Sequence, residues 1–261
     1  MAQRESAAKI SRPAGRPGYV CRLPSFVRGV HRGRPAFYGG EVMDRWLNKI
    51  LLGDCLDIMR EMPDKCVDLV LTDPPYGIGE ARKNNSSRSC LAASKDYGCK
   101  SWDDSIPSSE HFREIFRVSK NQIIFGGNYF VNNLANSSCW IVWDKDNGEN
   151  DFADCELAWT SFKTAVRRFK YRWQGMLQEN MRDKEKRIHP TQKPVALFEW
   201  ILRLYSKPGD IILDPFLGSG TTVAACINLE RQYIGIEISP DYVLASQQRI
   251  KKATEQRRLF L

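Results

Sequence analysis

The sequence predicts an α/β protein whose mainly parallel sheet is covered by helices on both faces. Three observations support this fold class. From Met43 onward, short apolar runs typical of strands alternate with stretches that suit helices. Val67–Thr72 is an apolar run of the kind expected for a strand buried on both faces. A tight glycine turn, Gly218–Gly220, joins an apolar strand to a helix. A chain of 261 residues suffices for one such domain with a substantial core.

The expected elements succeed one another in a regular order. In the first half we predict strands over Asn48–Leu52, Val67–Thr72, Gln122–Phe125, Trp140–Trp143 and Glu156–Thr160, and helices over Cys55–Met62 and His111–Val118. In the second half we predict strands over Asp210–Leu213 and Gln232–Glu237, and helices over Thr221–Leu229 and Asp241–Lys251. Pro194 opens a further amphipathic helix through Tyr205, because proline fits the first turn of a helix. Residues 77–100 have little apolar content and are predicted to form a long loop.

The net charge of +8 is distributed unevenly. Residues 1–42 hold eight basic and two acidic residues, residues 77–100 hold five and two, and residues 160–188 hold nine and three. The rest of the chain is acidic overall. Basic segments within an acidic body are typical of a protein that binds nucleic acid.

Residues 1–42 differ from the rest of the chain, because they are rich in Arg, Gly and Pro and lack apolar periodicity. We interpret them as a basic, disordered leader, with a nucleic-acid-binding arm as an alternative. A third interpretation is that the true start is Met43, since Gly39–Val42 is what a purine-rich ribosome-binding sequence would encode in frame. Residues 43–261 form the predicted domain.

Composition disfavours several classes of protein. No apolar run approaches the roughly 18 residues of a membrane span, and no secretory signal comes after the Arg-rich start, so we expect a cytoplasmic protein without membrane contact. The eight cysteines form no C-x-x-C pair and the chain has only three histidines. We therefore expect no metal site.

The segment Ile211–Thr222 predicts a ligand-binding turn, because glycines let the backbone approach a ligand and a helix N-terminus offers free N–H groups. Glu237 ends the next strand, 17 positions after Gly220, where an acid can accept both ribose hydroxyls. Asp214 would repel a pyrophosphate but pair with the ammonium of a methionine moiety. The turn also lacks the lysine of a triphosphate loop and has Val223 where a dinucleotide loop needs a small residue. These features favour S-adenosyl-L-methionine over nucleotides and over a plain strand–turn–helix.

A second motif, Asp73-Pro74-Pro75-Tyr76, comes directly after the apolar strand, at the strand end where open α/β sheets bind ligands. The Asp73 carboxylate and the Pro74 carbonyl offer two acceptors for the two N–H groups of an exocyclic base amine. Pro75 holds the direction of the Pro74 carbonyl by restricting the backbone. Hydrogen bonds from both N–H groups to these acceptors free the nitrogen lone pair for in-line attack on a sulfonium methyl. The Asp73 carboxylate then stabilises the positive charge that develops on the nitrogen. Tyr76 can stack on a base flipped out of the duplex. The alternative is a structural Pro-Pro turn capped by an Asp.

With these motifs the chain resembles the DNA amino-methyltransferases of restriction-modification systems and phages, in the permuted class where the catalytic motif precedes the cofactor motif. The resemblance covers about residues 45–250. Further matching segments are Gly53-Asp54, Trp102-Asp103, Trp143-Asp144-Lys145 and His189-Pro190-Thr191-Gln192-Lys193-Pro194. The resemblance implies a Rossmann-like methyltransferase fold with a seven-stranded sheet and one reversed strand, in a bacterial or phage-infected cell.

The resemblance also implies roles for particular residues. The cofactor-binding residues are expected to be Asp54, which would receive the adenine amino group, with Lys193, Asp214, Phe216, Gly218, Ser219, Gly220, Thr221 and Glu237. A short target-recognition insert is expected over about residues 162–187. Within it, Arg167, Arg168, Lys170 and Arg172 are expected to contact DNA phosphates. A solvated charged face is the alternative for these four. The implied partners are double-stranded DNA, a second copy of the chain and a cognate restriction endonuclease.

The favoured activity is methylation of adenine N6 in a short DNA sequence. Cytosine N4 methylation is the nearest alternative, because the amine chemistry is the same; Asp at position 73 favours adenine, since related cytosine enzymes often carry Ser there. Cytosine C5 methylation is disfavoured because it needs a nucleophilic cysteine after proline, and no Pro-Cys pair occurs. RNA as substrate and a catalytically inactive DNA-binding module are further alternatives. The retained Asp73 and Asp214 argue against the inactive module.

Overall fold

The computed structural model describes residues 40–79, 106–148, 153–174, 177–182, 184–188 and 191–258. All of them belong to one compact unit, Tyr38–Leu261. The segments Trp102-Asp103 and His189-Pro190, most of the predicted loop 77–100 and nearly all of the predicted leader lie outside the described residues. The first described helix, α1 (Gly40–Asp44), begins three residues before Met43.

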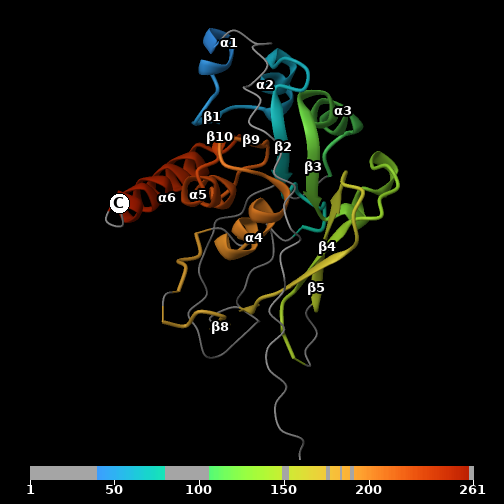
Figure 1. Ribbon diagram of the computed structural model, residues 1–261, viewed down its shortest axis with the longest axis vertical. Coiled ribbons are helices and arrows are strands. Elements are labelled where there is room, and N and C mark those ends of the chain that lie inside the picture. Colours follow the sequence, from blue (N-terminus) through green and yellow to red (C-terminus); the bar gives the residue numbers. More distant parts are fainter. Residues whose placement is uncertain are drawn as a thin grey trace, which may run out of the picture. The chain divides into compact units, whose positions relative to one another are not determined.

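One sheet dominates the described part of the chain (Figure 1). Its strands, in spatial order, are β1 (Lys49–Leu52), β10 (Gln232–Glu237), β9 (Ile211–Asp214), β2 (Val67–Thr72), β3 (Ser119–Phe125), β5 (Cys155–Thr160), β4 (Trp140–Asp144) and β6 (Arg167–Lys170). Among the described strands of this sheet, β5 alone runs antiparallel to its neighbours. The predicted α/β class, with a mostly parallel sheet and one reversed strand, is confirmed.

The sheet has an eighth strand where the sequence predicts seven. This strand is β6, which pairs in parallel with β4 from Ile141↔Arg167 to Asp144↔Lys170. It comes from the segment predicted as a recognition insert, whose basic composition conceals the strand. A small hairpin of β7 (Trp173–Gln174) and β8 (Leu177–Gln178) comes after it. The insert therefore begins as an edge of the main sheet rather than as a separate loop.

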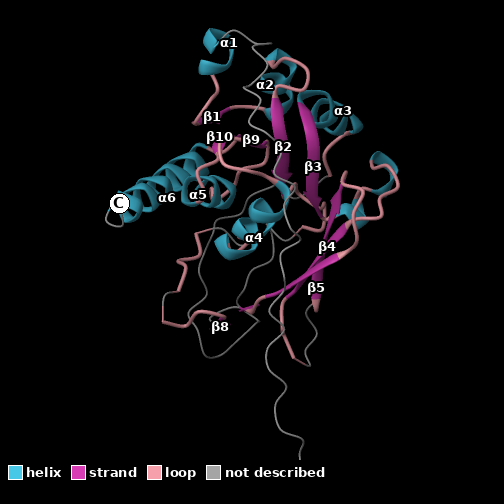
Figure 2. Ribbon diagram, in the orientation of Figure 1, coloured by secondary structure: helices cyan, strands magenta, loops and turns pink. Residues whose placement is uncertain are grey.

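Helices, which are cyan in Figure 2, cover both faces of the magenta sheet. On one face, α2 (Cys55–Glu61) and α3 (Ser109–Val118) bury Met59, Phe112 and Ile115 against the strands. On the other face, α4 (Val195–Tyr205) and α5 (Thr221–Asn228) pack Leu197, Ile201, Cys226 and their neighbours. The long α6 (Pro240–Arg258) packs beside α5 and β1. Among the described helices, none is long and apolar enough to cross a membrane.

Strand β9 shows why apolar runs form the centre of this sheet. Ile211 and Leu213 enter one core cluster and Ile212 enters the other, because successive side chains of a strand point to opposite faces. A strand buried on both faces must therefore be apolar at every position. The predicted boundaries agree with the structure to within a few residues, except that α6 continues to Arg258. Pro194 caps α4 with an extended backbone and does not lie in its first turn.

The order of the parallel strands brings distant motifs to one edge. β2 pairs with β9, β9 with β10, and β10 with β1, all in parallel, so their carboxyl ends lie side by side. Asp73 comes directly after β2, Asp214 and Glu237 are the last residues of β9 and β10, and Asp54 lies two residues beyond β1. Open α/β sheets bind ligands at this edge.

Candidate active site

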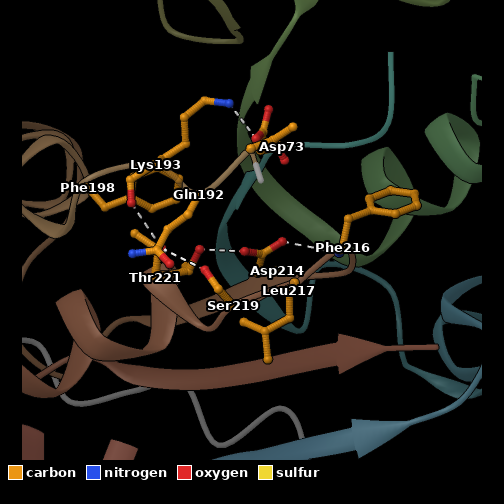
Figure 3. Close-up of a pocket in the computed structure, with 12 residues that line it drawn as sticks. Asp73, Gln192, Lys193, Phe198, Asp214, Phe216, Leu217, Ser219 and Thr221 are labelled. Carbon is orange, nitrogen blue, oxygen red and sulfur yellow. Dashed lines mark hydrogen bonds and ion pairs between the residues drawn. The ribbon is translucent and has the colours of Figure 1, made fainter. Parts of the chain in front are cut away.

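Asp73 lies in a buried ion pair at the end of β2. One carboxylate oxygen, Oδ1, accepts the Tyr76 hydroxyl at 2.5 Å, and the other, Oδ2, accepts the Lys193 ammonium. The Lys193 side chain is 6% exposed and that of Asp73 is 18% exposed. Figure 3 shows the lysine reaching across to Asp73 from the segment before α4. Both oxygens of the candidate catalytic carboxylate therefore already have donors within the protein.

Lys193 also contacts a second acid, Glu156 on β5, with Nζ 2.9 Å from Oε2. Lys145, directly after β4, pairs with the other oxygen of Glu156 at 2.6 Å. Two ammonium groups and two carboxylates thus alternate in the order Lys145, Glu156, Lys193, Asp73. Their formal charges cancel, which lets the whole row lie away from solvent.

The pKa values of this row follow from burial and from the alternating charges. Burial raises the pKa of the Asp73 carboxyl; Lys193 opposes that rise and the Glu156 carboxylate adds to it. Burial alone would raise the pKa of Glu156, but Lys193 and Lys145 lower it to about 2. Burial alone would lower the pKa of Lys193, but Asp73 and Glu156 raise it well above its usual value. Asp73 is therefore the acid of the row that protonates first as pH falls.

Tyr76 is held in an aromatic cluster. Its ring stacks on Tyr129 with centroids 4.9 Å apart and planes 14° apart, and Phe130 meets it nearly edge-on at 6.1 Å. Tyr129 is 44% exposed, so one side of the cluster faces solvent. Gly126 lies against the Tyr76 ring and has a φ of +69°. The cluster gives the site a planar apolar surface beside Asp73.

The glycine turn forms the neighbouring part of the site, after β9. Gly220 caps α5 with a φ of +78°, and a Cβ there would lie 2.8 Å from Ser246 Cβ on α6. Ser219 and Thr221 are buried, and the Thr221 hydroxyl donates to the Lys193 carbonyl at 3.2 Å. The turn thus packs between α6 and the segment that carries Lys193.

Asp214 lies beneath this turn and is 4% exposed. Its Oδ1 accepts from the Thr72 hydroxyl at 2.7 Å and the Phe216 N–H at 3.1 Å, and its Oδ2 accepts from the Thr222 hydroxyl. Burial raises the pKa of Asp214 to about 6, although these three donors oppose the rise. The bond from Thr72 joins β2, which ends next to Asp73, directly to the strand that leads into the glycine turn.

Glu237 and Asp54 lie at the ends of the next two strands. Glu237 accepts from the Gly218 N–H and the Ser239 N–H, each at 2.8 Å, through different oxygens. Each carboxylate oxygen has two lone pairs, so these bonds leave acceptor capacity. Asp54 is exposed and caps α2 by accepting the Leu56 N–H at 2.8 Å. Both acids therefore lie at the strand ends that the sequence predicts, and each also organises its own loop.

An open cavity joins the two motifs. It encloses about 350 Å³ of empty space, open solvent included, and is lined by Asp73, Thr191, Gln192, Lys193, Phe198, Asp214, Phe216, Leu217, Gly218, Ser219, Thr221 and Thr222 (Figure 3). The acids Asp73 and Asp214 line it together with the N-terminus of α5, while Glu237 supports the turn from below. Acids suit the ammonium and sulfonium charges of S-adenosyl-L-methionine. They oppose a phosphate.

Arg249 of α6 connects the glycine turn to Glu185, in the predicted insert 162–187. Its guanidinium donates to the Ser219 carbonyl at 3.3 Å and the Thr221 hydroxyl at 3.1 Å, and it pairs with Glu185 at 2.6 Å. Glu185 in turn accepts the Val195 N–H at 2.8 Å at the start of α4. One arginine therefore joins three parts of the chain that are distant in sequence.

The four basic residues predicted to contact DNA lie close together. Arg167, Arg168 and Lys170 are exposed on β6, and Arg172 lies just beyond it. Lys170 and Arg172 each lie 2.8 Å from a carboxylate oxygen of Asp146, and Arg168 lies 3.9 Å from Asp144. Exposed pairs of this kind contribute little to stability, so the three cations remain accessible to an anionic ligand.

The aromatic residues between these cations point inward. Phe169 packs against Tyr171 and Trp200 at centroid distances of 5.5 and 5.1 Å. Trp173 is 5% exposed and donates its indole N–H to the Gln192 carbonyl at 2.8 Å. These aromatic residues attach the basic segment to the domain, next to Lys193.

Among the described residues, Asp54, Cys55 and His111 bring possible metal ligands within 4.8 Å of one another. Asp54 already caps α2, and the His111 Nδ1 lies 2.9 Å from the Ser108 hydroxyl. Burial raises the pKa of the Cys55 thiol to about 12, which opposes the thiolate that a metal needs. The cluster is therefore a poor metal site.

Sequence reasoning did not identify Glu156, Tyr129 or Arg249 as site residues. Glu156 carried a signal, because a charge inside an otherwise apolar strand needs a buried partner. Lys145 lies in Trp143-Asp144-Lys145, which sequence reasoning linked to the methyltransferase family without giving the lysine a role. Arg249 lies on a charged helix, where nothing in the sequence distinguishes one arginine from its neighbours.

Comparison with known proteins agrees with this geometry. Residues 126–248 match the N6/N4 methyltransferase family, described as DNA methylase. The chain is 27% identical to the Type II methyltransferase M.HinfI of Haemophilus influenzae, over 81% of this chain and 70% of that protein. It is also 27% identical to the Type II methyltransferase M.HpaI of Haemophilus parainfluenzae, over 77% and 74% of the two chains.

Solved structures share the fold. The DNA modification methylase TTHA0409 of Thermus thermophilus, complexed with S-adenosyl-L-methionine, aligns with a TM-score of 0.50 at 20% identity, over 78% of this chain and 95% of that one. The PvuII DNA methyltransferase, which is cytosine-N4-specific, aligns with a TM-score of 0.51 at 18% identity, over 79% of this chain and 90% of that one. The chain is thus similar to DNA amino-methyltransferases of the restriction-modification type.

Proposed function

We propose that this DNA methyltransferase transfers a methyl group from S-adenosyl-L-methionine to the N6 amino group of adenine in a short double-stranded DNA sequence. The observation that carries the proposal is the adjacency of the two motifs. Asp73 directly follows β2 and Asp214 ends the neighbouring parallel strand β9, and the Thr72 hydroxyl bridges the strands by its 2.7 Å bond to Asp214. The acceptor for an amino group and the cofactor turn therefore line one cavity.

Asp73 acts on the target amine as a hydrogen-bond acceptor. The lone pair of an exocyclic amino group is delocalised into the ring, so the nitrogen is a poor nucleophile. A carboxylate and a backbone carbonyl, those of Asp73 and Pro74, can accept its two N–H groups and localise the lone pair. Positive charge that develops on the nitrogen then lies beside the Asp73 carboxylate, which is already fixed in place.

The cofactor would be held by the turn after β9 and by the neighbouring strand ends. When bound, S-adenosyl-L-methionine would supply a methyl group made electrophilic by its sulfonium, which the base nitrogen would accept while the thioether leaves. Asp214 and the N–H groups of Ser219 to Thr221 would hold the methionine end, Glu237 the ribose and Asp54 the adenine amino group. The nitrogen afterwards loses one proton to Asp73 and then to water.

The aromatic cluster provides the contact for a flipped base. A base within a duplex cannot reach a carboxylate that is 18% exposed, so the target nucleotide must leave the stack. Tyr76, fixed by Tyr129 and Phe130, offers a planar ring next to Asp73. The exposed cations of β6 and Arg172 would contact the phosphates of the DNA around it. A second copy of the chain and a restriction endonuclease that reads the same sequence are the further partners we propose.

The test is methyl transfer to unmethylated genomic DNA with radiolabelled cofactor, for the full chain and for Asp73→Ala. We expect the variant to lose about 10³-fold in rate while its cofactor affinity stays within a factor of about three. Hydrolysis of the labelled DNA identifies the base. Label in N4-methylcytosine would keep the mechanism and replace adenine as the target. Full activity of the variant would contradict the proposal.

A further inference from the structure

We propose that Glu156 is a positioning residue, which takes the Lys193 ammonium from Asp73 when the target amino group binds there. The inference rests on the proposed function, because it concerns how the methyl-accepting amine reaches Asp73. It gives a role to Glu156, Lys193 and Lys145, three charged residues that the transfer chemistry itself does not use.

The first observation is that Asp73 has no unused oxygen. The Tyr76 hydroxyl donates to Oδ1 and the Lys193 ammonium donates to Oδ2. Carboxylate lone pairs that already accept a charged donor are poor acceptors for a neutral amine. Each oxygen keeps a second lone pair, so a base amino group can still approach Asp73, but it binds well only once the competing Lys193 cation leaves. Lys193 is the donor with a second acid within reach.

The second observation is the position of that acid. Lys193 is 6% exposed, so its ammonium cannot move into solvent, and an unpaired buried cation would be costly. Glu156 Oε2 lies 2.9 Å from Nζ, yet it is buried and receives no hydrogen bond of good geometry. A small rotation of the lysine end would complete that bond. Lys145 meanwhile holds the other oxygen of Glu156 at 2.6 Å, so the acceptor stays in place.

The shift has a consequence for catalysis. Paired with Lys193, Asp73 is a neutralised carboxylate; once Lys193 bonds to Glu156, Asp73 is an anion next to the amine. The positive charge that develops on the nitrogen then meets a carboxylate without a competing cation. No proton moves in this step, because Lys193 stays an ammonium and Glu156 stays a carboxylate throughout.

The groups that face Asp73 define how variants should respond to pH. They are Lys193 before α4, Glu156 on β5, the Tyr76 hydroxyl and Asp214 on β9, with Lys145 behind Glu156. Removing the cation in Lys193→Met should make Asp73 easier to protonate and move the acid limb of activity to higher pH. Removing the anion in Glu156→Gln should move that limb to lower pH, while Lys193 stays bound to Asp73.

The experiment measures initial rates of methyl transfer to unmethylated genomic DNA, at saturating cofactor, between pH 5 and pH 9 as an approximate range around the carboxyl and ammonium pKa values. The proteins are the full chain, Glu156→Gln, Lys193→Met, Lys193→Arg and the double variant Lys193→Met with Glu156→Gln. We expect Glu156→Gln to lower the plateau rate about 30-fold, with cofactor affinity unchanged. In the Lys193→Met background the same substitution should change the plateau less than about threefold, because no lysine remains to be moved. Lys193→Arg should keep the acid limb of the wild type.

Equal losses from Glu156→Gln in both backgrounds, or no loss in either, would overturn the inference. So would a loss without any shift of the acid limb, since that is the effect of structural damage. If the single variant Glu156→Gln does not fold, the plateau rates of Lys193→Met and the double variant still test the inference. The double variant restores a neutral row of charges. A wild type that methylates no DNA refutes the proposed function itself, whereas active wild type with additive variants refutes only the inference.

Discussion

The ring of Tyr76 fills the space where a side chain at position 126 would stand. A Cβ on Gly126 would lie 2.2 Å from Tyr76 Cε1, far inside van der Waals contact, and the φ of +69° at this position already favours glycine. Gly126 comes directly after β3, while Tyr76 lies beyond the end of β2, so the neighbouring strands bring them together. The position of Tyr76 thus depends on a glycine 50 residues further along the chain.

We therefore expect Gly126→Ala to displace Tyr76 and to lower the rate of methyl transfer by about 100-fold, as small misplacements of reacting groups can do. Cofactor affinity, measured by calorimetry, should change little, because neither Gly126 nor Tyr76 lines the cavity beside the turn after β9. The matched control is Gly209→Ala, with a φ of +82° and open space around a Cβ. It should lose about 1 kcal/mol of stability and no activity. Equal activity in both variants would contradict the proposed position of the base.

Glu237→Gln should weaken cofactor binding by about 10- to 100-fold. The variant keeps the shape but places an amide NH₂ opposite the N–H of Gly218 or Ser239, both of which now donate to the carboxylate. Asp57→Asn is the control, since Asp57 is exposed on nearby α2 and forms only a loose pair with Arg60. Calorimetric titration measures both. Equal affinities would show that Glu237 only supports the turn.

Arg249→Met and Glu185→Gln should each weaken cofactor binding by about 10-fold, and the double variant should be no worse than Arg249→Met alone. The reason is that both residues act through one contact, 2.6 Å long, between the recognition segment and the cofactor turn. Arg203→Met, which removes an exposed cation 3.9 Å from Glu199, serves as the control. Additive losses would mean that the two residues act separately.

Replacing both Lys170 and Arg172 with Ala should weaken DNA binding at all sequences and lower the salt dependence of the affinity. Removal of one phosphate contact should reduce the slope of log K against log salt by about 0.9. Arg113→Ala on α3 is the control, because Arg113 is 72% exposed and lies near Glu110. Fluorescence anisotropy at several salt concentrations measures the slope. An unchanged slope would show that Lys170 and Arg172 do not contact DNA phosphates and belong to a solvated charged face.

Strands and helices of the central domain could be predicted because burial on both faces requires unbroken apolar sequence, as in Ile211–Asp214. The eighth strand could not, since Arg167–Lys170 is an edge strand whose backbone pairs with β4 while its basic side chains stay in solvent. Edge strands need no apolar alternation, and their basic residues suggest a loop. The reversed strand β5 could be expected only from the family resemblance.

The two motifs of the site could be found because each combines residue types that one chemistry needs within a few positions. The row of alternating charges could not be found from the sequence. Its members Lys145, Glu156 and Lys193 come from three segments, and only the fold brings them to Asp73. Sequence also assigned Lys193 to the cofactor. In the structure its ammonium is directed to Asp73 and Glu156, while its carbonyl accepts from Thr221 of the cofactor turn.

The central claim is methylation of adenine N6 in a short DNA sequence. It is tested most directly by expressing the full chain in a bacterium without DNA methylation and sequencing the genome by a method that reports modified bases. We predict N6-methyladenine in one short motif, and its disappearance on Asp73→Ala. Unmodified DNA from cells that contain folded, cofactor-binding protein would contradict the claim.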